Sequence, residues 1–66
     1  MLTRRQQKIL TLIEAQQRVR VDVLAADFAT SPQTIRKDLQ ALEELHHVVR
    51  FHGGATRMAV VVLVPV

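Results

Sequence analysis

A fifteen-residue stretch, SPQTIRKDLQALEEL from Ser31 to Leu45, constrains the fold of this chain more than any other. Ser31 is a favoured helix N-cap, and Pro32 fits the first helical position because that position needs no N–H donor. At about 100° per residue, the predicted helix has an apolar face and a polar face. The apolar face carries Ile35, Leu39 and Leu42, with His46 in line, and the polar face carries Gln33, Lys37, Gln40 and Glu44.

Thr34 and Arg36 flank the polar face near the start of this helix, and no carboxylate precedes Asp38. The first two turns therefore present amide, hydroxyl, guanidinium and ammonium groups, which suit the base edges and phosphates of nucleic acids. The alternative is an ordinary amphipathic surface helix, whose outer face is also polar. The rest of the chain must decide between them.

Length and composition limit the possible architectures. Sixty-six residues form one small domain with a thin core. Cysteine is absent, which excludes disulfides and thiolate metal sites and fits a reducing cytoplasm. The N-terminus lacks the apolar segment of a secretory signal and the apolar run at 59–64 is too short to cross a bilayer, so we expect a cytoplasmic protein without membrane association. The net charge of +3 favours polyanions, and the basic residues concentrate at Arg4, Arg5, Lys8, Arg18, Arg20, Arg36 and Lys37.

The N-terminal segment predicts a core helix from Thr3 to about Gln16. Thr3 and Gln6 have the spacing of a capping box, in which each side chain serves a free backbone N–H. An apolar stripe follows at helical spacing, formed by Ile9, Leu12 and Ile13 with Leu2 and Gln16 in line. The basic residues of its first two turns either contact a phosphate or are solvated surface charges.

A helix-turn-helix is predicted next. Val19 to Val21 alternates as a short edge strand, and Asp22 is expected to cap a helix from Val23 to Ala29 with Phe28 as its central core residue. The connection to the helix at Ser31 is very short, and such a pair with polar and basic residues on its second helix is more often a DNA reader than a purely structural unit.

A β-hairpin follows the reader helix. The run Val48 to Phe51 is expected to pair with Val19 to Val21, and the turn at His52-Gly53-Gly54 uses glycine for positive φ. The predicted fold class is mostly α with a small β wing, a three-helix winged helix-turn-helix. The wing is expected to bring Arg50, His52 and Arg57 near the DNA backbone or minor groove.

The segments LAADFATSPQTIRKDLQALEE and VVRFHGGA resemble the N-terminal DNA-binding domain of the DeoR family of bacterial transcriptional regulators, over residues 3 to 57. The resemblance implies operator binding, usually as a repressor of sugar-metabolism genes. It also implies a larger C-terminal domain that binds a phosphorylated sugar, so no effector is expected to bind residues 1–57. By resemblance, the DNA contacts would be Ser31, Gln33, Thr34, Arg36 and Lys37, to which the face and wing arguments add Gln40, Arg50, His52 and Arg57.

The sequence departs from the family pattern at three places. Gln17 and His46 stand where the family commonly has glycine, and a left-handed conformation there costs on the order of 1 kcal/mol each. After Arg57, an apolar tail at 58–66 replaces the family's continuation, so the expected organisation is a DNA-binding domain at 1–57 and a tail at 58–66. An excised domain is one explanation, and a truncated or frame-shifted product is favoured. The uncharged tail is expected to self-associate, and a specific homodimer formed through the tail is the alternative.

Other site types find less support. His46, His47 and His52 lack the carboxylate or thiolate neighbours of a usual metal site, and no catalytic set or cofactor motif is present. Asp38 is expected to form a structural ion pair, with Arg50 as the candidate partner. A winged-helix protein-interaction module and a non-functional remnant are the alternatives, and the charged reader face favours DNA over protein docking.

Overall fold

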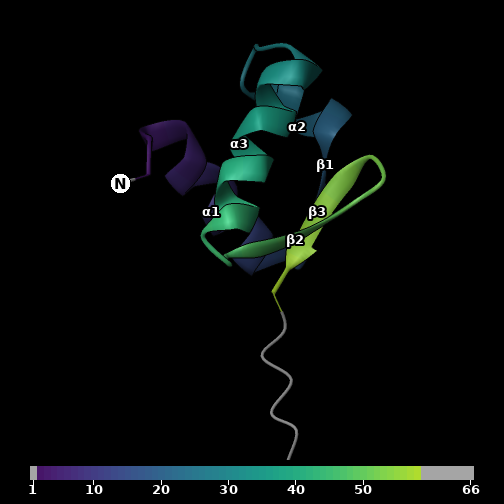
Figure 1. Ribbon diagram of the computed structural model, residues 1–66. Coiled ribbons are helices and arrows are strands. Elements are labelled where there is room, and N and C mark those ends of the chain that lie inside the picture. Colours follow the sequence, from purple (N-terminus) through teal and green to yellow (C-terminus); the bar gives the residue numbers. More distant parts are fainter. Residues whose placement is uncertain (1, 59–66) are drawn as a thin grey trace, which may run out of the picture.

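The computed structural model describes residues 2–58 and contains three helices and a three-stranded antiparallel sheet, as the sequence predicted (Figure 1). The elements follow the order α1 (Arg4–Gln16), β1 (Arg18–Arg20), α2 (Val21–Asp27), α3 (Pro32–Glu44), β2 (Val48–Phe51) and β3 (Gly54–Arg57). This is a winged helix-turn-helix, in which α2 and α3 form the helix pair and the β2–β3 hairpin forms the wing. The predictions for the apolar tail concern residues 58–66, and all of these except Met58 lie outside the described part of the chain.

Two of the three predicted helix starts are confirmed. The Thr3 hydroxyl accepts the Gln6 N–H at 3.1 Å and the Gln6 side chain accepts the Thr3 N–H at 3.1 Å, which completes the capping box of α1. Ser31 caps α3 by accepting the Thr34 N–H at 3.2 Å, with Pro32 in the first helical position. These two helix starts therefore follow from local sequence alone.

The predicted start and end of α2 are wrong. This helix begins at Val21 and ends at Asp27, and its N-cap residue, Arg20, makes no side-chain capping bond. The Val21 N–H instead donates to the Gly53 carbonyl at 2.9 Å, so the wing turn supplies the partner that a cap would provide. Asp22 lies in the first turn, where its carboxylate accepts the Val23 N–H at 2.9 Å.

The predicted pairing between Val19 to Val21 and β2 is also wrong. The strand order is β1-β3-β2, so β1 pairs with β3 in antiparallel register with Val19 opposite Ala55. The tight turn at His52-Gly53 folds β3 back along β2 and leaves the other edge of β3 free for β1. A Cβ on Gly54 would lie 2.1 Å from the Val19 carbonyl oxygen, so this close strand approach requires glycine.

The core lies between the three helices and the inner face of the sheet. Ile35, Leu39 and Leu42 are at most 1% exposed, which confirms the predicted inner face of α3. They pack with Ile9, Ile13, Leu24 and Val48. Phe28, predicted as the central core residue, is only partly buried at the edge of this cluster.

Two residues expected on apolar faces, Gln16 and His46, are exposed. Gln16 is the last residue of α1, and Gln17 after it leaves the helical conformation. His46 follows the end of α3 and itself leaves the helical conformation. Among the described residues, positive φ occurs at Gln17 (72°), Ala29 (51°), His46 (62°) and Gly53 (92°). The family resemblance indicated Gln17 and His46 as such positions, whereas nothing in the sequence analysis indicated Ala29.

The turns after α2 and α3 share one hydrogen-bond pattern. The His47 N–H donates to the Leu42 carbonyl at 2.9 Å, and the Thr30 N–H donates to the Ala25 carbonyl at 2.9 Å. Each bond closes a Schellman turn around a residue of positive φ, a place where glycine is usual. The helix-turn-helix therefore uses alanine, and the turn into the wing uses histidine, at a conformational cost.

Candidate nucleic-acid interface

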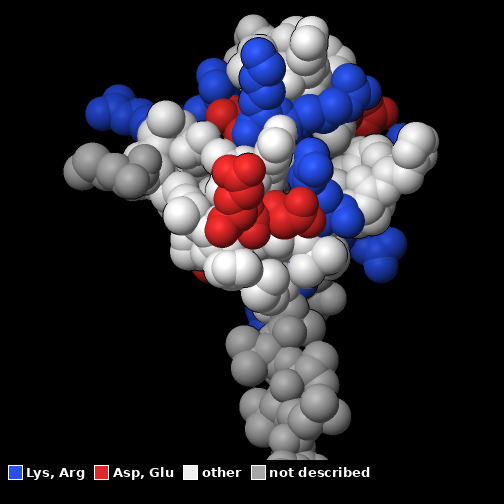
Figure 2. Space-filling model, viewed as in Figure 1, with Lys and Arg blue, Asp and Glu red and all other residues white. Residues whose placement is uncertain are grey.

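The outer face of α3 exposes four of the predicted contact residues to solvent. Gln33, Arg36, Lys37 and Gln40 are all exposed, opposite the buried face of the same helix. Figure 2 shows Lys and Arg side chains over the part of this surface where α3 begins and along the side toward the hairpin, whereas Asp and Glu side chains gather toward the end of α3. The surface is therefore basic and amide-rich at one end of α3 only.

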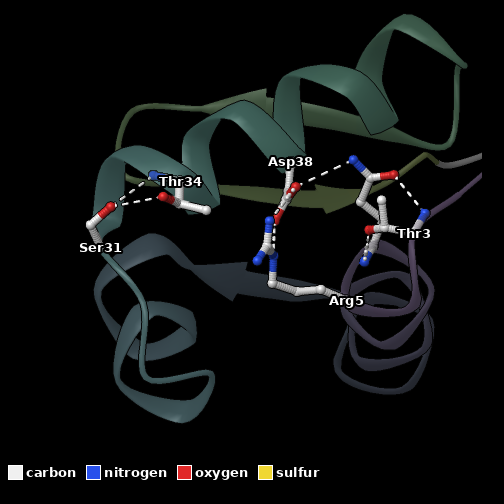
Figure 3. Close-up of polar contacts among 6 residues, drawn as sticks. Thr3, Arg5, Ser31, Thr34 and Asp38 are labelled. Atoms are coloured by element: carbon white, nitrogen blue, oxygen red, sulfur yellow. Dashed lines mark hydrogen bonds and ion pairs between the residues drawn. The ribbon is translucent and has the colours of Figure 1, made fainter.

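The hydroxyls of Ser31 and Thr34 already have partners within the chain. Ser31 Oγ accepts the Thr34 N–H, and the two hydroxyl oxygens lie 2.9 Å apart (Figure 3). Ser31 is exposed and Thr34 is partly buried. Their first role is to begin α3, which also places the positive end of the helix dipole beside the basic surface.

The hairpin lies along α3 from its second turn to its last, and the two elements line a groove of about 470 Å³. Arg36 on α3 and Arg50 and His52 on the hairpin line this groove together. The structure therefore brings two of the predicted wing residues to the predicted reader helix. Its remaining lining consists of Val21, Leu39, Glu43, Phe51, Gly53 and Gly54.

Arg57, the third predicted wing residue, lies elsewhere. It is opposite Val48 at the base of the hairpin, the end away from the His52-Gly53 turn. There it lines a separate hollow with Glu14, His46 and His47. His52 is at the other end of the hairpin, and no group of three possible metal ligands occurs among residues 2–58.

Arg50 forms an ion pair with Glu43, not with Asp38 as predicted. Arg50 Nε donates to Glu43 Oε1 at 3.0 Å, and the Arg50 backbone N–H donates to Glu43 Oε2 at 2.9 Å. These bonds from the Arg50 backbone and side chain lower the pKa of the Glu43 carboxyl group. Glu43 thus links the last turn of α3 to the wing, a role that sequence spacing did not indicate.

Asp38 turns inward and pairs with Arg5 on α1. Asp38 is buried, with 5% of the residue exposed, and its carboxylate accepts bonds from Arg5 Nε and, at 3.2 Å, from Arg5 Nη2 (Figure 3). Gln6 Nε2 donates to Asp38 Oδ1 at 3.3 Å. The Asp38 partner raises the pKa of Arg5. Consequently the one carboxylate in the first half of α3 does not reach the outer face.

Arg20 is a candidate contact residue that the site prediction missed. It lies opposite Gly54 at the end of β1, next to the wing turn, and it is exposed. Its Nη2 lies 3.3 Å from Asp22 Oδ2 in a solvent-exposed pair. The alternation of Arg18, buried Val19 and Arg20 was the available signal, since alternate strand residues face opposite sides.

No helix among the described residues has the length and apolar character needed to cross a bilayer.

Residues 5–60 match the family model of the DeoR-like helix-turn-helix domain. The chain is 48% identical over 54 residues to the putative galactitol utilization operon repressor of Escherichia coli, covering 82% of this chain and 48% of that protein. It is 43% identical over 53 residues to the glycerol-3-phosphate regulon repressor of E. coli, covering 80% of this chain and 21% of that protein. An uncharacterized HTH-type transcriptional regulator of Bacillus subtilis is 40% identical over 55 residues, covering 83% of this chain and 21% of that protein.

The chain thus spans between about a fifth and a half of the length of these relatives. No solved structure matches the chain significantly. The family match covers most of the chain and includes all three helices and the wing. The chain therefore belongs to the DeoR-like helix-turn-helix family.

Proposed function

We propose that this domain binds double-stranded DNA with the outer face of α3 in the major groove and the turn of the wing against the adjacent backbone. The observation that carries the proposal is the composition of that face. Gln33, Arg36, Lys37 and Gln40 are exposed there, while the Asp38 carboxylate is buried against Arg5. A helix of about 10–12 Å diameter fits the major groove, and amide and guanidinium groups match the donor and acceptor pattern of base edges.

The side chains divide into two kinds of contact. Gln33, Arg36 and Gln40 suit base edges, because amides pair with adenine and guanidinium with guanine. Lys37, Arg50, His52 and Arg20 suit phosphates, which position a protein without reading sequence. Ser31 and Thr34 support the positive end of α3. Arg57 is left out of the proposed interface because it lies at the far end of the hairpin.

Members of this family act in DNA-binding transcriptional regulation. By analogy with the relatives named for galactitol and glycerol-3-phosphate, we propose that the chain represses genes for the metabolism of a sugar or polyol. The proposal includes no catalytic step. It places the protein in the cytoplasm, because a bacterial operator is reached only there.

The test begins with selection of bound sequences from a pool of random duplexes. The selected duplex and a random duplex of equal length are then titrated at several salt concentrations. With roughly 4–6 phosphate contacts, affinity should fall by about two to three orders of magnitude between 50 and 200 mM salt. A flat salt response, or the absence of an enriched sequence, would contradict the proposal. Binding to another protein without binding to any duplex would favour the alternative of a protein-interaction module.

A further inference from the structure

We infer that Glu43 is a positioning residue that helps the domain to discriminate between DNA sequences. It holds the wing against α3, and its ion pair with Arg50 prevents Arg50 from contacting the phosphates of every duplex alike. The inference rests on the proposed function, because it concerns how the same interface separates one sequence from another. It assigns a task to an acidic residue in a basic interface, where a carboxylate would otherwise only repel DNA.

The geometry of the pair goes beyond an ordinary surface ion pair. One carboxylate oxygen accepts the Arg50 Nε–H at 3.0 Å, and the other accepts the Arg50 backbone N–H at 2.9 Å. Glu43 therefore holds both the side chain and the main chain of one wing residue. A contact that includes the backbone fixes where β2 lies relative to α3, whereas a contact between side chains alone leaves the strand free to shift.

The strand order explains why this backbone bond matters. β2 is an outer strand, with β3 on one side only. Outer strands have unpaired N–H groups that are free to bond other chains. Within the described residues, Glu43 satisfies one of these groups and thereby covers the edge of the wing at Arg50.

Stability is a weak explanation for the pair. The Arg50 and Glu43 side chains are 40% and 38% exposed, and exposed ion pairs typically contribute only about 0–1 kcal/mol. The pair borders the groove that also contains Arg36 and His52. Its position thus favours a role in the interface over a role in holding the fold.

The charge of the pair bears directly on discrimination. Non-specific DNA binding depends almost entirely on cationic contacts with phosphate, so each free cation raises affinity for every sequence. Specificity is the ratio of the affinities for the right and the wrong DNA, and a repulsive or withheld contact can raise it. Glu43 therefore neutralises the charge of Arg50, except on a duplex whose phosphate lies where Arg50 can contact it while still paired with Glu43.

Glu44 provides a matched control because it is the neighbouring glutamate, is exposed, and forms no ion pair among residues 2–58. E43Q and E44Q remove the same charge, but only E43Q weakens the hold on Arg50. We expect E44Q to raise affinity for the selected and random duplexes by one common factor. We expect E43Q to lower the ratio of the two affinities by about tenfold, the discrimination of one base contact.

The salt dependence distinguishes this role from a purely structural one. Release of Arg50 in E43Q should steepen the slope of log affinity against log salt for the random duplex by about 0.9, the value of one added phosphate contact. The double variant E43Q/R50A should lose that increment. Equal ratios and equal slopes for E43Q and E44Q would overturn the inference while leaving DNA binding by the domain intact.

A measurement without DNA tests the geometry separately. Exchange of the Arg50 amide hydrogen should be faster in E43A than in the wild type and unchanged in E44A, because Glu43, and not Glu44, accepts that N–H. Unchanged exchange in E43A would overturn the positioning role even if DNA binding is observed. If the wild type binds no duplex, the proposed function fails and the inference about discrimination fails with it, whatever the exchange data show.

Discussion

The carboxylate of Asp38, in the middle of α3, accepts two hydrogen bonds from the guanidinium of Arg5, in the first turn of α1 (Figure 3). Gln6, which closes the capping box of α1, donates to the same carboxylate. The start of α1 is thereby attached to the centre of the proposed reader helix. This network fixes the rotation of α3 about its axis and hence the set of side chains that faces outward.

Arg5→Ala should destabilise the domain by about 1–3 kcal/mol, because it leaves the Asp38 carboxylate buried with only the Gln6 amide as a side-chain partner. The neighbouring variant Arg4→Ala is the control. Arg4 is exposed and forms no ion pair within the described chain, so its loss should change stability by less than about 0.5 kcal/mol. Urea denaturation measures both, and equal effects would show that the Arg5–Asp38 pair does not stabilise the fold.

Glycine at the positive-φ positions should stabilise the protein. Ala29→Gly and His46→Gly each remove a left-handed strain of about 1–2 kcal/mol but increase the entropy of the unfolded chain, for a net gain of roughly 0.5–1 kcal/mol. Ala29 should gain more, because histidine tolerates this region better than alanine. Ala26→Gly, at an exposed helical position, should instead lose about 1 kcal/mol. Thermal melting ranks the three variants, and a loss at Ala29 would contradict the strain argument.

Ile35→Ala should cost roughly 2–5 kcal/mol, because the side chain is 0% exposed at the centre of the core and truncation leaves a cavity. Val23 offers a comparison on α2, where its side chain is 49% exposed. Val23→Ala should change stability by less than about 0.5 kcal/mol. An Ile35→Ala variant with the melting temperature of the wild type would refute the assigned inner face of α3.

Arg36→Ala and Lys37→Ala should weaken DNA binding without unfolding the domain, since both side chains are exposed. Removal of a base-reading guanidinium at Arg36 should cost about 1–3 kcal/mol and relax sequence preference, whereas removal of the Lys37 ammonium should weaken all duplexes alike and reduce the salt slope by about 1. Arg18→Ala, on β1 away from the groove, is the control for loss of charge. Circular dichroism should remain helical, and an equal effect at Arg18 would argue against a specific role for α3.

Acid should remove the stabilising contribution of Glu43. The bonds from Arg50 hold the pKa of this carboxyl group below its ordinary value of 4.5 in the folded state. A lowered folded pKa stabilises the protein above the unfolded pKa, and this contribution is lost as the pH falls through the folded pKa. The difference in melting temperature between wild type and E43Q should therefore be constant near neutral pH and shrink below pH 4.5. A gap that widens in acid would contradict the assigned direction of the pKa shift.

Local sequence rules predicted the parts of the fold that depend on local geometry. The capping box at Thr3, the cap at Ser31 and the inner face of α3 follow from residue type and helical spacing. The exposure of Gln33 and Arg36 follows from the same spacing. These features were predictable because each depends on residues within one or two helical turns.

The errors in strand order, in the start of α2 and in the partner of Asp38 concern partners that are distant in sequence. Spacing does not show that β3 lies between β1 and β2, or that the Val21 N–H finds the Gly53 carbonyl instead of a capping side chain. The partner of Asp38 is 33 positions away, on α1, whereas the sequence prediction placed it on the wing. Ion pairs and strand order depend on how the elements pack, which local pattern does not contain.

The strand order also has a consequence for synthesis of the protein. A ribosome produces β1 and β2 before β3, yet within residues 2–58 both β1 and β2 pair with β3 and not with each other. All three helices have therefore left the ribosome before either outer strand can bond to its neighbour. The residues of the helix pair are thus synthesised before the sheet has all its strands, and the four residues from Gly54 to Arg57 join two separate strands into one sheet.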